Sequence, residues 1–186
     1  MLSHPTLLAF IRHEQLGKCL RSFTGRELVA VAARLETSAT SEVARWRQES
    51  TVTVRERLDV SGFGPWTSEL GIPHVGAPSS VLKQMLIVRI VCGSGMQETP
   101  SLQVLVGSHQ AGKLTDTQLT QLVAASPRTT LQVPSGTLLL IKPLLVHSAP
   151  AGVLSRRYHV LHLTFAPAEA ISPLQWSSRV ELHTAA

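Results

Sequence analysis

His147 ends the most apolar run of the sequence, which extends from Thr137 to Val146. A second strand-like stretch, Arg156–Phe165, begins nine residues later with two arginines and a tyrosine. An imidazole at the end of a buried strand, followed by cationic and aromatic side chains, is typical of a metal and carboxylate site inside a β-barrel. Such a site also needs a carboxylate and a second imidazole from an earlier strand, and the sequence offers Arg47-Gln48-Glu49 instead. The pattern therefore predicts a metal site that is only half present.

Length and charge favour a single domain that binds a small molecule. A chain of 186 residues fits one domain, residues 1–186, with a sizeable core. The 17 Lys and Arg exceed the 12 Asp and Glu only modestly, and they are scattered along the chain. Nucleic-acid binding usually shows a basic stripe with aromatic platforms, whereas this sequence holds 3 Trp, 1 Tyr and 4 Phe. We therefore expect no nucleic-acid partner, and an anionic small ligand or a coenzyme phosphate explains the mild basicity equally well.

Cysteine usage and hydropathy indicate a reducing compartment. Cys19 and Cys92 are the two cysteines, and their spacing suggests neither a disulfide framework nor a zinc site. The sequence has no apolar stretch of about 18 uninterrupted residues, so no membrane span is expected. Residues 1–5 have neither the charged region nor the long apolar region of a signal peptide. The sequence predicts a cytoplasmic protein.

The hydrophobic pattern predicts many short strands and few helices. Helices are expected over residues 5–16, ended by Gly17, and over 115–125, which begin at a capping motif. Strands are expected over residues 27–35, 43–54, 81–91 after a short helix, 102–106, 129–133, 136–146, 157–165 and 178–183. Residues 59–80, rich in Gly and Pro, predict a long irregular loop that covers a pocket. The result is a β-sandwich or barrel with helical additions, and the pattern does not choose between a jelly roll and another sandwich.

An ordered series of motifs carries a family resemblance. The motifs are Trp46–Thr51, Arg55–Trp66, Gly71–His74, Gln84–Leu86, Val106–His109, Gly112–Leu114, Gly136–His147 and Val160–Ala166. On these segments, from about His4 to Trp176, the chain resembles the phytanoyl-CoA dioxygenase-like family, particularly its bacterial branch. The resemblance implies a double-stranded β-helix, iron(II) and 2-oxoglutarate as cofactors, and hydroxylation of a small organic substrate. It also implies a chain that is short at its amino end.

The resemblance implies three positions for iron ligands. The family supplies His-x-Asp on one strand and a second histidine on a distant strand, and the matching residues here are Arg47, Glu49 and His147. The extra methylene of a glutamate moves its oxygens by roughly a bond length, whereas metal–ligand distances tolerate only about 0.2 Å. A guanidinium has no lone pair to offer a metal. An Arg47–Glu49 ion pair in place of the metal site is therefore expected, with Glu49 as a metal ligand the alternative.

The resemblance also implies where 2-oxoglutarate would bind. The family's arginine for the keto acid lies about eleven residues after the distal histidine, and that position holds Tyr158. Arg157 faces the other side of the strand by alternation, while Arg156 has the same parity as Tyr158. Thr51 matches a family position close to the keto acid. A tyrosine donates a hydrogen bond but no charge, so binding of 2-oxoglutarate is doubtful on residue chemistry.

Four other side chains have two interpretations each. Trp66 either packs over the barrel mouth or anchors the long loop. His74 and His159 are imidazoles that would replace a lost ligand, although nothing in their spacing requires it. Taken alone, His147 is interpreted as a core histidine whose ring nitrogens are hydrogen-bonded. With the family resemblance, it is interpreted as a residue of the site.

Three hypotheses on function follow from these residues. The first is an iron(II)/2-oxoglutarate dioxygenase with Glu49 and His147 as partial ligands. The second is a non-catalytic relative that binds an anionic molecule through Arg47, Arg156 or Arg157. The third is an interaction domain or a decaying gene product. The chemistry of Arg47 favours weak or absent iron-dependent turnover, and the family favours a dioxygenase.

Overall fold

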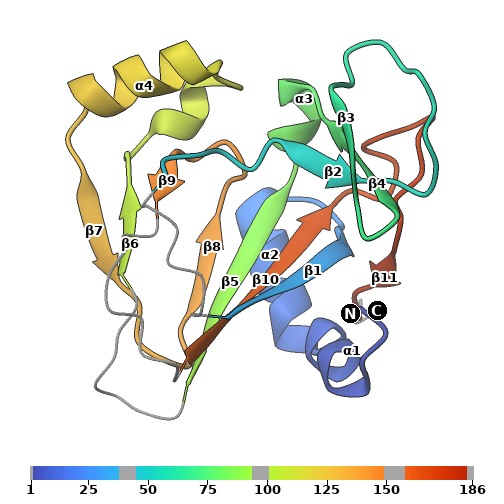
Figure 1. The fold of residues 1–186 in the computed structure, drawn as a ribbon. Coiled ribbons are helices and arrows are strands. Elements are labelled where there is room, and N and C mark those ends of the chain that lie inside the picture. Colours follow the sequence, from blue (N-terminus) through green and yellow to red (C-terminus); the bar gives the residue numbers. More distant parts are fainter. Residues whose placement is uncertain (1, 38–44, 94–100, 149–157, 184–186) are drawn as a thin grey trace. The chain divides into compact units, whose positions relative to one another are not determined.

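The computed structural model describes residues 2–37, 45–93, 101–148 and 158–183 (Figure 1). Over these residues the chain is mainly β, with antiparallel strand pairs and four α-helices. Hydrogen bonds join the strands into a five-stranded sheet of order β11-β1-β10-β5-β8 and two three-stranded sheets, β2-β4-β3 and β7-β6-β9. The expected mainly-β fold with helical additions is confirmed.

The elements have the following bounds. The helices are α1 (Pro5–Ile11), α2 (Glu14–Thr24), α3 (Ser79–Leu82) and α4 (Asp116–Ala125), with a 3-10 turn η1 (Ser108–Ala111). The strands are β1 (Val29–Thr37), β2 (Thr51–Thr53), β3 (Trp66–Glu69), β4 (Ile72–Gly76), β5 (Leu86–Gly93), β6 (Ser101–Val104), β7 (Thr129–Gln132), β8 (Leu138–Ile141), β9 (His147–Ser148), β10 (Tyr158–Ala166) and β11 (Val180–Glu181).

The chain divides into two compact units. The first unit comprises Met1–Arg34, Thr51–Leu86 and Leu163–Ala186, and the second comprises Leu35–Ser50 and Ile87–His162. Strands β1 and β10 pass through both units. The expectation of one domain over residues 1–186 stays a prediction, and each unit is described by itself.

The first helical segment differs from the expected single helix over residues 5–16. Helix α1 ends at Ile11, and α2 begins at Glu14 because the ring of His13 accepts a hydrogen bond from the backbone N–H of Gln15. Gly17 does not end a helix but lies buried inside α2, where an added Cβ would approach the carbonyl oxygen of His183 to 3.1 Å. The helix ends instead at Gly25, which adopts a left-handed conformation with φ of 65°.

Residues 66–76 form a hairpin within the segment 59–80, for which the Gly and Pro content predicts an irregular loop throughout. Strands β3 and β4 form a hairpin whose last pair is Glu69 opposite Ile72. Leu70 and Gly71 between them both have positive φ, 51° and 78°, which is the backbone of a type I′ turn. Leucine is rare in the first turn position because its Cβ disfavours positive φ. Of the Asn-Gly or Asp-Gly pair that usually marks such a turn, the sequence has only the glycine. That this segment covers a pocket stays a prediction.

In the second unit, the expected strand over residues 136–146 is interrupted. Strand β8 ends at Ile141, two residues before Pro143, which cannot donate to a strand ladder. His147 begins the separate short strand β9, which pairs with β6. His147 therefore does not close a continuous buried strand, as its position after the apolar run suggested.

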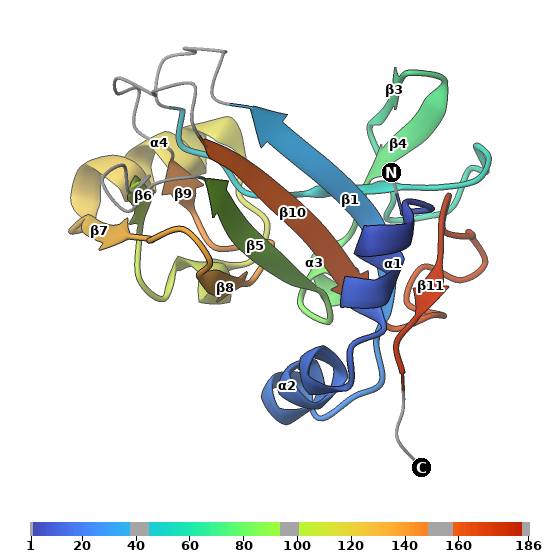
Figure 2. The same ribbon diagram turned by 90° about the horizontal axis from the view of Figure 1, so that it is seen from below.

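A small cluster of apolar side chains lies in the second unit. Val91 of β5, Val133 and Val160 of β10 are buried, and Leu131 of β7 and Leu139 of β8 pack against them. Strand β5 lies beside β10, and their arrows point in opposite directions (Figure 2). Because side chains alternate along a strand, residues two positions from a cluster member lie on the same face. Arg89 of β5 and His162 of β10 are two positions from Val91 and Val160 and therefore lie on this face.

Several other expectations hold. Helix α4 begins at Thr115 with a reciprocal capping box to Gln118. Val52 and Val54 are buried while Thr51 is exposed, as the alternation predicts, although the strand expected over residues 43–54 is regular only at β2 and residues 38–44 lie outside the described residues. None of the helices in the described residues has the length and apolar character needed to span a membrane.

We predict that Phe165→Ala lowers the free energy of unfolding by about 3–5 kcal/mol, because it removes a large ring from a close-packed core. Phe165 of β10 has an exposed fraction of 0%. Phe23→Ala is the matched control, since Phe23 is 68% exposed and its removal should change the value by less than about 0.5 kcal/mol. Urea unfolding followed by circular dichroism measures both, and equal losses would contradict the burial of Phe165.

Candidate functional site

Arg47 and His147 lie side by side although they are far apart in the sequence. The backbone N–H of each donates to the carbonyl of the other at 3.0 Å, which makes an isolated antiparallel bridge. Residues that exchange both bonds have Cα atoms about 5.5 Å apart and project their side chains to the same face of the strands. The backbone thus brings together two of the three positions that the family resemblance implies for iron ligands.

Glu49 contacts Arg47 and lies two residues after it in the chain. The backbone N–H of Glu49 donates to the carbonyl of Pro143 at 2.8 Å, which holds this stretch against the loop before His147. Extended residues two positions apart project to the same side, and the Nε–H of Arg47 donates to Oε1 of Glu49 at 3.2 Å. The ion pair expected from the sequence is present.

The ring of His147 is oriented as in a metal ligand. Its Nδ1 lies 2.9 Å from the carbonyl oxygen of Leu145. A carbonyl only accepts, so Nδ1 carries the proton and the lone pair of the neutral ring is on Nε2. That Nε2 is 3.7 Å from Oε1 of Glu49, and the side chain is 3% exposed. His147 is therefore a buried imidazole directed at the Arg47–Glu49 pair.

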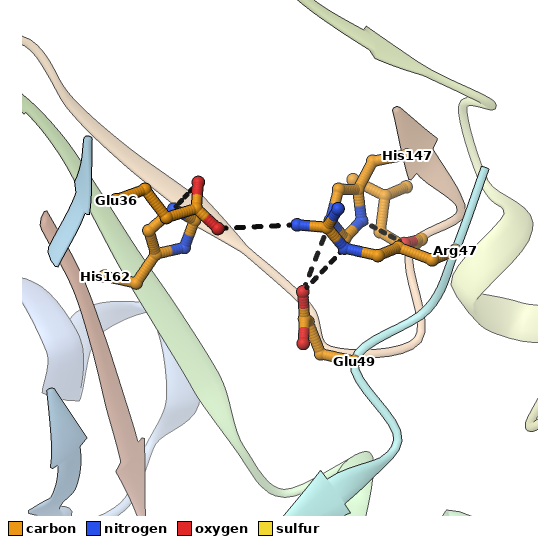
Figure 3. Close-up of polar contacts among 6 residues, drawn as sticks. Glu36, Arg47, Glu49, His147 and His162 are labelled. Atoms are coloured by element: carbon orange, nitrogen blue, oxygen red, sulfur yellow. Dashed lines mark hydrogen bonds and ion pairs between the residues drawn. The ribbon is translucent and has the colours of Figure 1, made fainter. Parts of the chain in front are cut away.

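Glu36 and His162 join the same group from the five-stranded sheet (Figure 3). Oε1 of Glu36 is 3.6 Å from Nη2 of Arg47, and its Oε2 is 3.1 Å from Nε2 of His162. The His162 side chain is 9% exposed, and the two glutamates are 34% and 30% exposed. Glu36, Arg47, Glu49, His147 and His162 all belong to the second unit. We refer to these five residues as the Arg47 cluster.

Sequence analysis missed Glu36 and His162. The strand expected over residues 27–35 stopped one residue before Glu36, whereas β1 continues to Thr37. A lone carboxylate at the end of an apolar strand was a usable signal, because such a charge near a core is normally paired. His162 has the parity of buried Val160 on β10, so strand alternation alone placed it on the inner face.

The residues of the Arg47 cluster do not fit iron(II). A facial iron site needs two imidazoles and one carboxylate on one side of the ion, with three open positions. Here a guanidinium, which has no lone pair and stays protonated, lies between two carboxylates where the first imidazole would be. Across the residues that the structure describes, no group of three or more His, Cys, Asp or Glu side chains is arranged to hold a metal ion.

Gln48 fixes the chain that carries Arg47 and Glu49. Its Nε2 donates to the carbonyls of Gly112 at 2.9 Å and Leu144 at 2.8 Å, and its Oε1 accepts the N–H of Leu114 at 2.9 Å. One amide thus joins three segments of the second unit. Arg47 and Glu49 project opposite to Gln48 along the chain, so this anchor sets the position of their ion pair.

The other expected residues lie in the first unit or have side chains outside the described part of the chain. Thr51, Trp66 and His74 belong to the first unit, where His74 pairs with Thr53 and Thr67 across the β2-β4-β3 sheet. The ring of Trp66 lies 5.5 Å from the guanidinium of Arg57. Their pocket roles stay predictions. The expected cosubstrate residues Arg156 and Arg157 lie outside the described residues, and of Tyr158 the structure describes only the backbone, at the start of β10. His159 is exposed and has the opposite parity to His162.

A comparison with solved structures identifies the fold that contains the Arg47 cluster. Apo HygX from Streptomyces hygroscopicus matches with a TM-score of 0.57 and 15% identity, covering 88% of this chain and 68% of HygX. SnoK, a non-heme α-ketoglutarate-dependent carbocyclase from nogalamycin biosynthesis, matches with a TM-score of 0.58 and 13% identity, covering 89% of this chain and 60% of SnoK. The chain has the fold of non-heme iron and 2-oxoglutarate oxygenases.

A third match and the cofactors of these proteins complete the comparison. The non-heme monooxygenase ThoJ, in a nickel complex, matches with a TM-score of 0.56 and 10% identity, covering 95% of this chain and 58% of ThoJ. This chain thus spans between 58% and 68% of the three proteins. Other HygX structures hold iron, or nickel with 2-oxoglutarate and hygromycin B. No family model matches the sequence, and no curated protein matches it.

We predict that Gln48→Glu destabilises the protein more at pH 7 than at pH 4.5. At pH 7 a carboxylate oxygen would face the carbonyls of Gly112 and Leu144 in place of an amide donor, which costs about 1–3 kcal/mol for each unsatisfied buried group. A protonated carboxyl restores one donor at low pH. Gln110→Glu, at an exposed position of the same unit, is the control. The difference from wild type in urea unfolding at each pH measures the effect, and a difference independent of pH would contradict it.

Proposed function

We propose that this chain is a relative of the phytanoyl-CoA dioxygenase-like proteins, with a double-stranded β-helix, whose iron-dependent turnover is weak or lost. The fold shared with HygX and SnoK supports the superfamily. The position of Arg47 between Glu36 and Glu49, beside His147, supports the loss of turnover. The simplest role for such a relative is to bind a small organic molecule in the cytoplasm.

Electrostatics explains why the Arg47 cluster disfavours a dication. A unit charge and a dication about 4 Å apart repel by about 8 kcal/mol at an effective dielectric of about 20. The guanidinium of Arg47 therefore offsets the attraction that one carboxylate at the same distance would supply. The guanidinium also lies within hydrogen-bond distance of Glu49, so a metal ion that binds Glu49 there would have to displace it. Both effects act against metal binding while Arg47 is in place.

We predict that the wild-type protein binds iron(II) or manganese(II) no more tightly than about 100 μM, because two ligands remain where three are needed. Arg47→His with Glu49→Asp should restore affinity, since it supplies an imidazole and a shorter carboxylate beside a histidine that already has the ligand orientation. Anaerobic calorimetric titration measures both proteins, and coupled assays of 2-oxoglutarate consumption test turnover.

His147→Asn in the doubly substituted protein is the control, and it should abolish the gained affinity. Tight stoichiometric binding by the wild type would contradict the proposed function. A doubly substituted protein that folds but gains no affinity would mean that the site is lost more widely than at Arg47 and Glu49.

A second candidate function is the binding of an anionic small molecule. Arg47, one of the arginines expected for this role, already contacts two carboxylates. Arg89 of β5 is a stronger candidate, because it is only 5% exposed and faces Leu139 across the β5–β8 pair, on the face of the apolar cluster. A guanidinium has several N–H donors, so it can bind a carboxylate while it keeps a hydrogen bond within the protein.

We predict that Arg89→Met weakens binding of a dicarboxylate about tenfold or more, because a charge-assisted hydrogen bond contributes about 1.5–3 kcal/mol. Succinate and 2-oxoglutarate are the probes, and calorimetry without metal measures their affinity. Arg45→Met, at an exposed position of the same unit, should leave binding unchanged. Equal affinity of wild type and Arg89→Met for both probes would exclude Arg89 as the anion-binding residue.

A further inference from the structure

His162 is a buried imidazole in contact with a carboxylate. Its side chain is 9% exposed, and its Nε2 lies 3.1 Å from Oε2 of Glu36, which belongs to β1 (Figure 3). The other carboxylate oxygen of Glu36 lies 3.6 Å from Nη2 of Arg47. Glu36 is thus shared between a permanent cation and a ring that becomes a cation only when it takes up a proton.

A buried guanidinium lies near His162 on the same face of the five-stranded sheet. Strands β5 and β10 are neighbours, and their arrows point in opposite directions (Figure 2). Val91 of β5 and Val160 of β10 belong to one apolar cluster, and Arg89 and His162 are each two positions away from it. Because the strands are antiparallel, a step back along β5 and a step forward along β10 lead the same way along the sheet. Arg89 and His162 therefore lie near each other.

Opposing effects act on the protonation of His162. The carboxylate of Glu36 stabilises the protonated ring, because it brings an opposite charge. Arg89, which is 5% exposed, brings a like charge and stabilises the neutral ring, as does the burial of the ring itself. An unperturbed histidine titrates at about pH 6.5, so a change of charge beside it alters its protonation at physiological pH.

The other charged groups of this region act on His162 less directly. Oε1 of Glu49 lies 3.2 Å from Nε of Arg47, and Nε2 of His147 lies 3.7 Å from that oxygen. Arg34 of β1 is exposed, so solvent and salt screen its charge. We expect these groups to change the protonation of His162 less than its two neighbours on the sheet do.

We propose that a carboxylate ligand of Arg89 binds together with one proton, which His162 takes up from solvent. The negative charge of the ligand offsets the repulsion between the guanidinium and the protonated ring, and the protonated ring in turn attracts the ligand. The proposal rests on the second candidate function, the binding of an anion by Arg89, and it assigns the regulation of that site. Binding is tighter in acid and weaker in alkali.

The affinity for 2-oxoglutarate at two pH values tests the coupling. Both carboxylates of this probe stay ionised between about pH 6 and about pH 8, so its own charge does not change. We expect metal-free wild type to bind it about fivefold more tightly at the lower pH, the ratio that corresponds to a ligand-induced shift of about one pH unit in the titration of His162. His162→Gln should remove this difference. His159→Gln, at an exposed position of the same strand, is the matched control and should keep it.

Calorimetry in two buffers with different ionisation enthalpies counts the proton directly. At about pH 7 the same shift corresponds to an uptake of about 0.4 proton per ligand by the wild type, and His162→Gln should take up none. The wild type alone gives this count, so the measurement decides the question even if His162→Gln folds poorly. Binding without proton uptake overturns the proposal.

The ring signals of His162 in the ligand-free protein test the roles of its two neighbours. Glu36→Gln should lower the midpoint of the His162 titration by about one pH unit, and Arg89→Met should raise it by about as much. Proton NMR measures both, and the signals of the exposed His159 should not change in either variant. A midpoint that neither substitution moves overturns the proposal.

Failure of the coupling is distinguishable from failure of the proposed function. Binding of 2-oxoglutarate that is independent of pH overturns the coupling and leaves anion binding by Arg89 standing. A pH dependence that is equal in wild type and His162→Gln assigns the proton to another group and also overturns the coupling alone. The absence of binding at both pH values contradicts the second candidate function, and the proposal with it.

Discussion

The guanidinium of Arg47 holds the polar residues of the second unit together. It contacts Glu36 and Glu49, and its backbone pairs with that of His147. Two carboxylates near a core repel each other unless a cation lies close to both, and Arg47 is a permanent cation of fixed geometry. Because the cation is covalently part of the chain, one positive charge stays close to both carboxylates without a bound ion.

Hydrogen bonds to the backbone fix the surroundings of Arg47. The imidazole of His147 is oriented through the carbonyl of Leu145, and Gln48 anchors the chain that carries Arg47 and Glu49. The fold shared with HygX and SnoK at 13–15% identity shows that the framework tolerates extensive change. At position 47 this chain carries a permanent positive charge and no lone pair. A fold therefore does not determine its chemistry, which depends on the donor atoms at the site.

Local patterns in the sequence were sufficient for several elements. The capping residues Thr115 and Gln118 gave the start of α4, and alternation gave β10 and the burial of Val52 and Val54. The same patterns failed where a non-local contact decides the conformation. Gly17 is inside α2 because it lies against the carbonyl of His183, and a glycine looks the same in a sequence whether it ends a helix or permits a close approach.

The sequence by itself determined that residue 47 cannot be a metal ligand, and it favoured Glu49 as the ion-pair partner of Arg47. These conclusions follow from the chemistry of side chains and from strand alternation, which are local properties. That His147 belongs to the same group was implied by the family resemblance. Only the tertiary structure decided that Glu36 and His162 complete the Arg47 cluster, because their strands, β1 and β10, meet through pairing between distant segments. Pairing of that kind depends on the register of a whole sheet, and no short stretch of sequence encodes it.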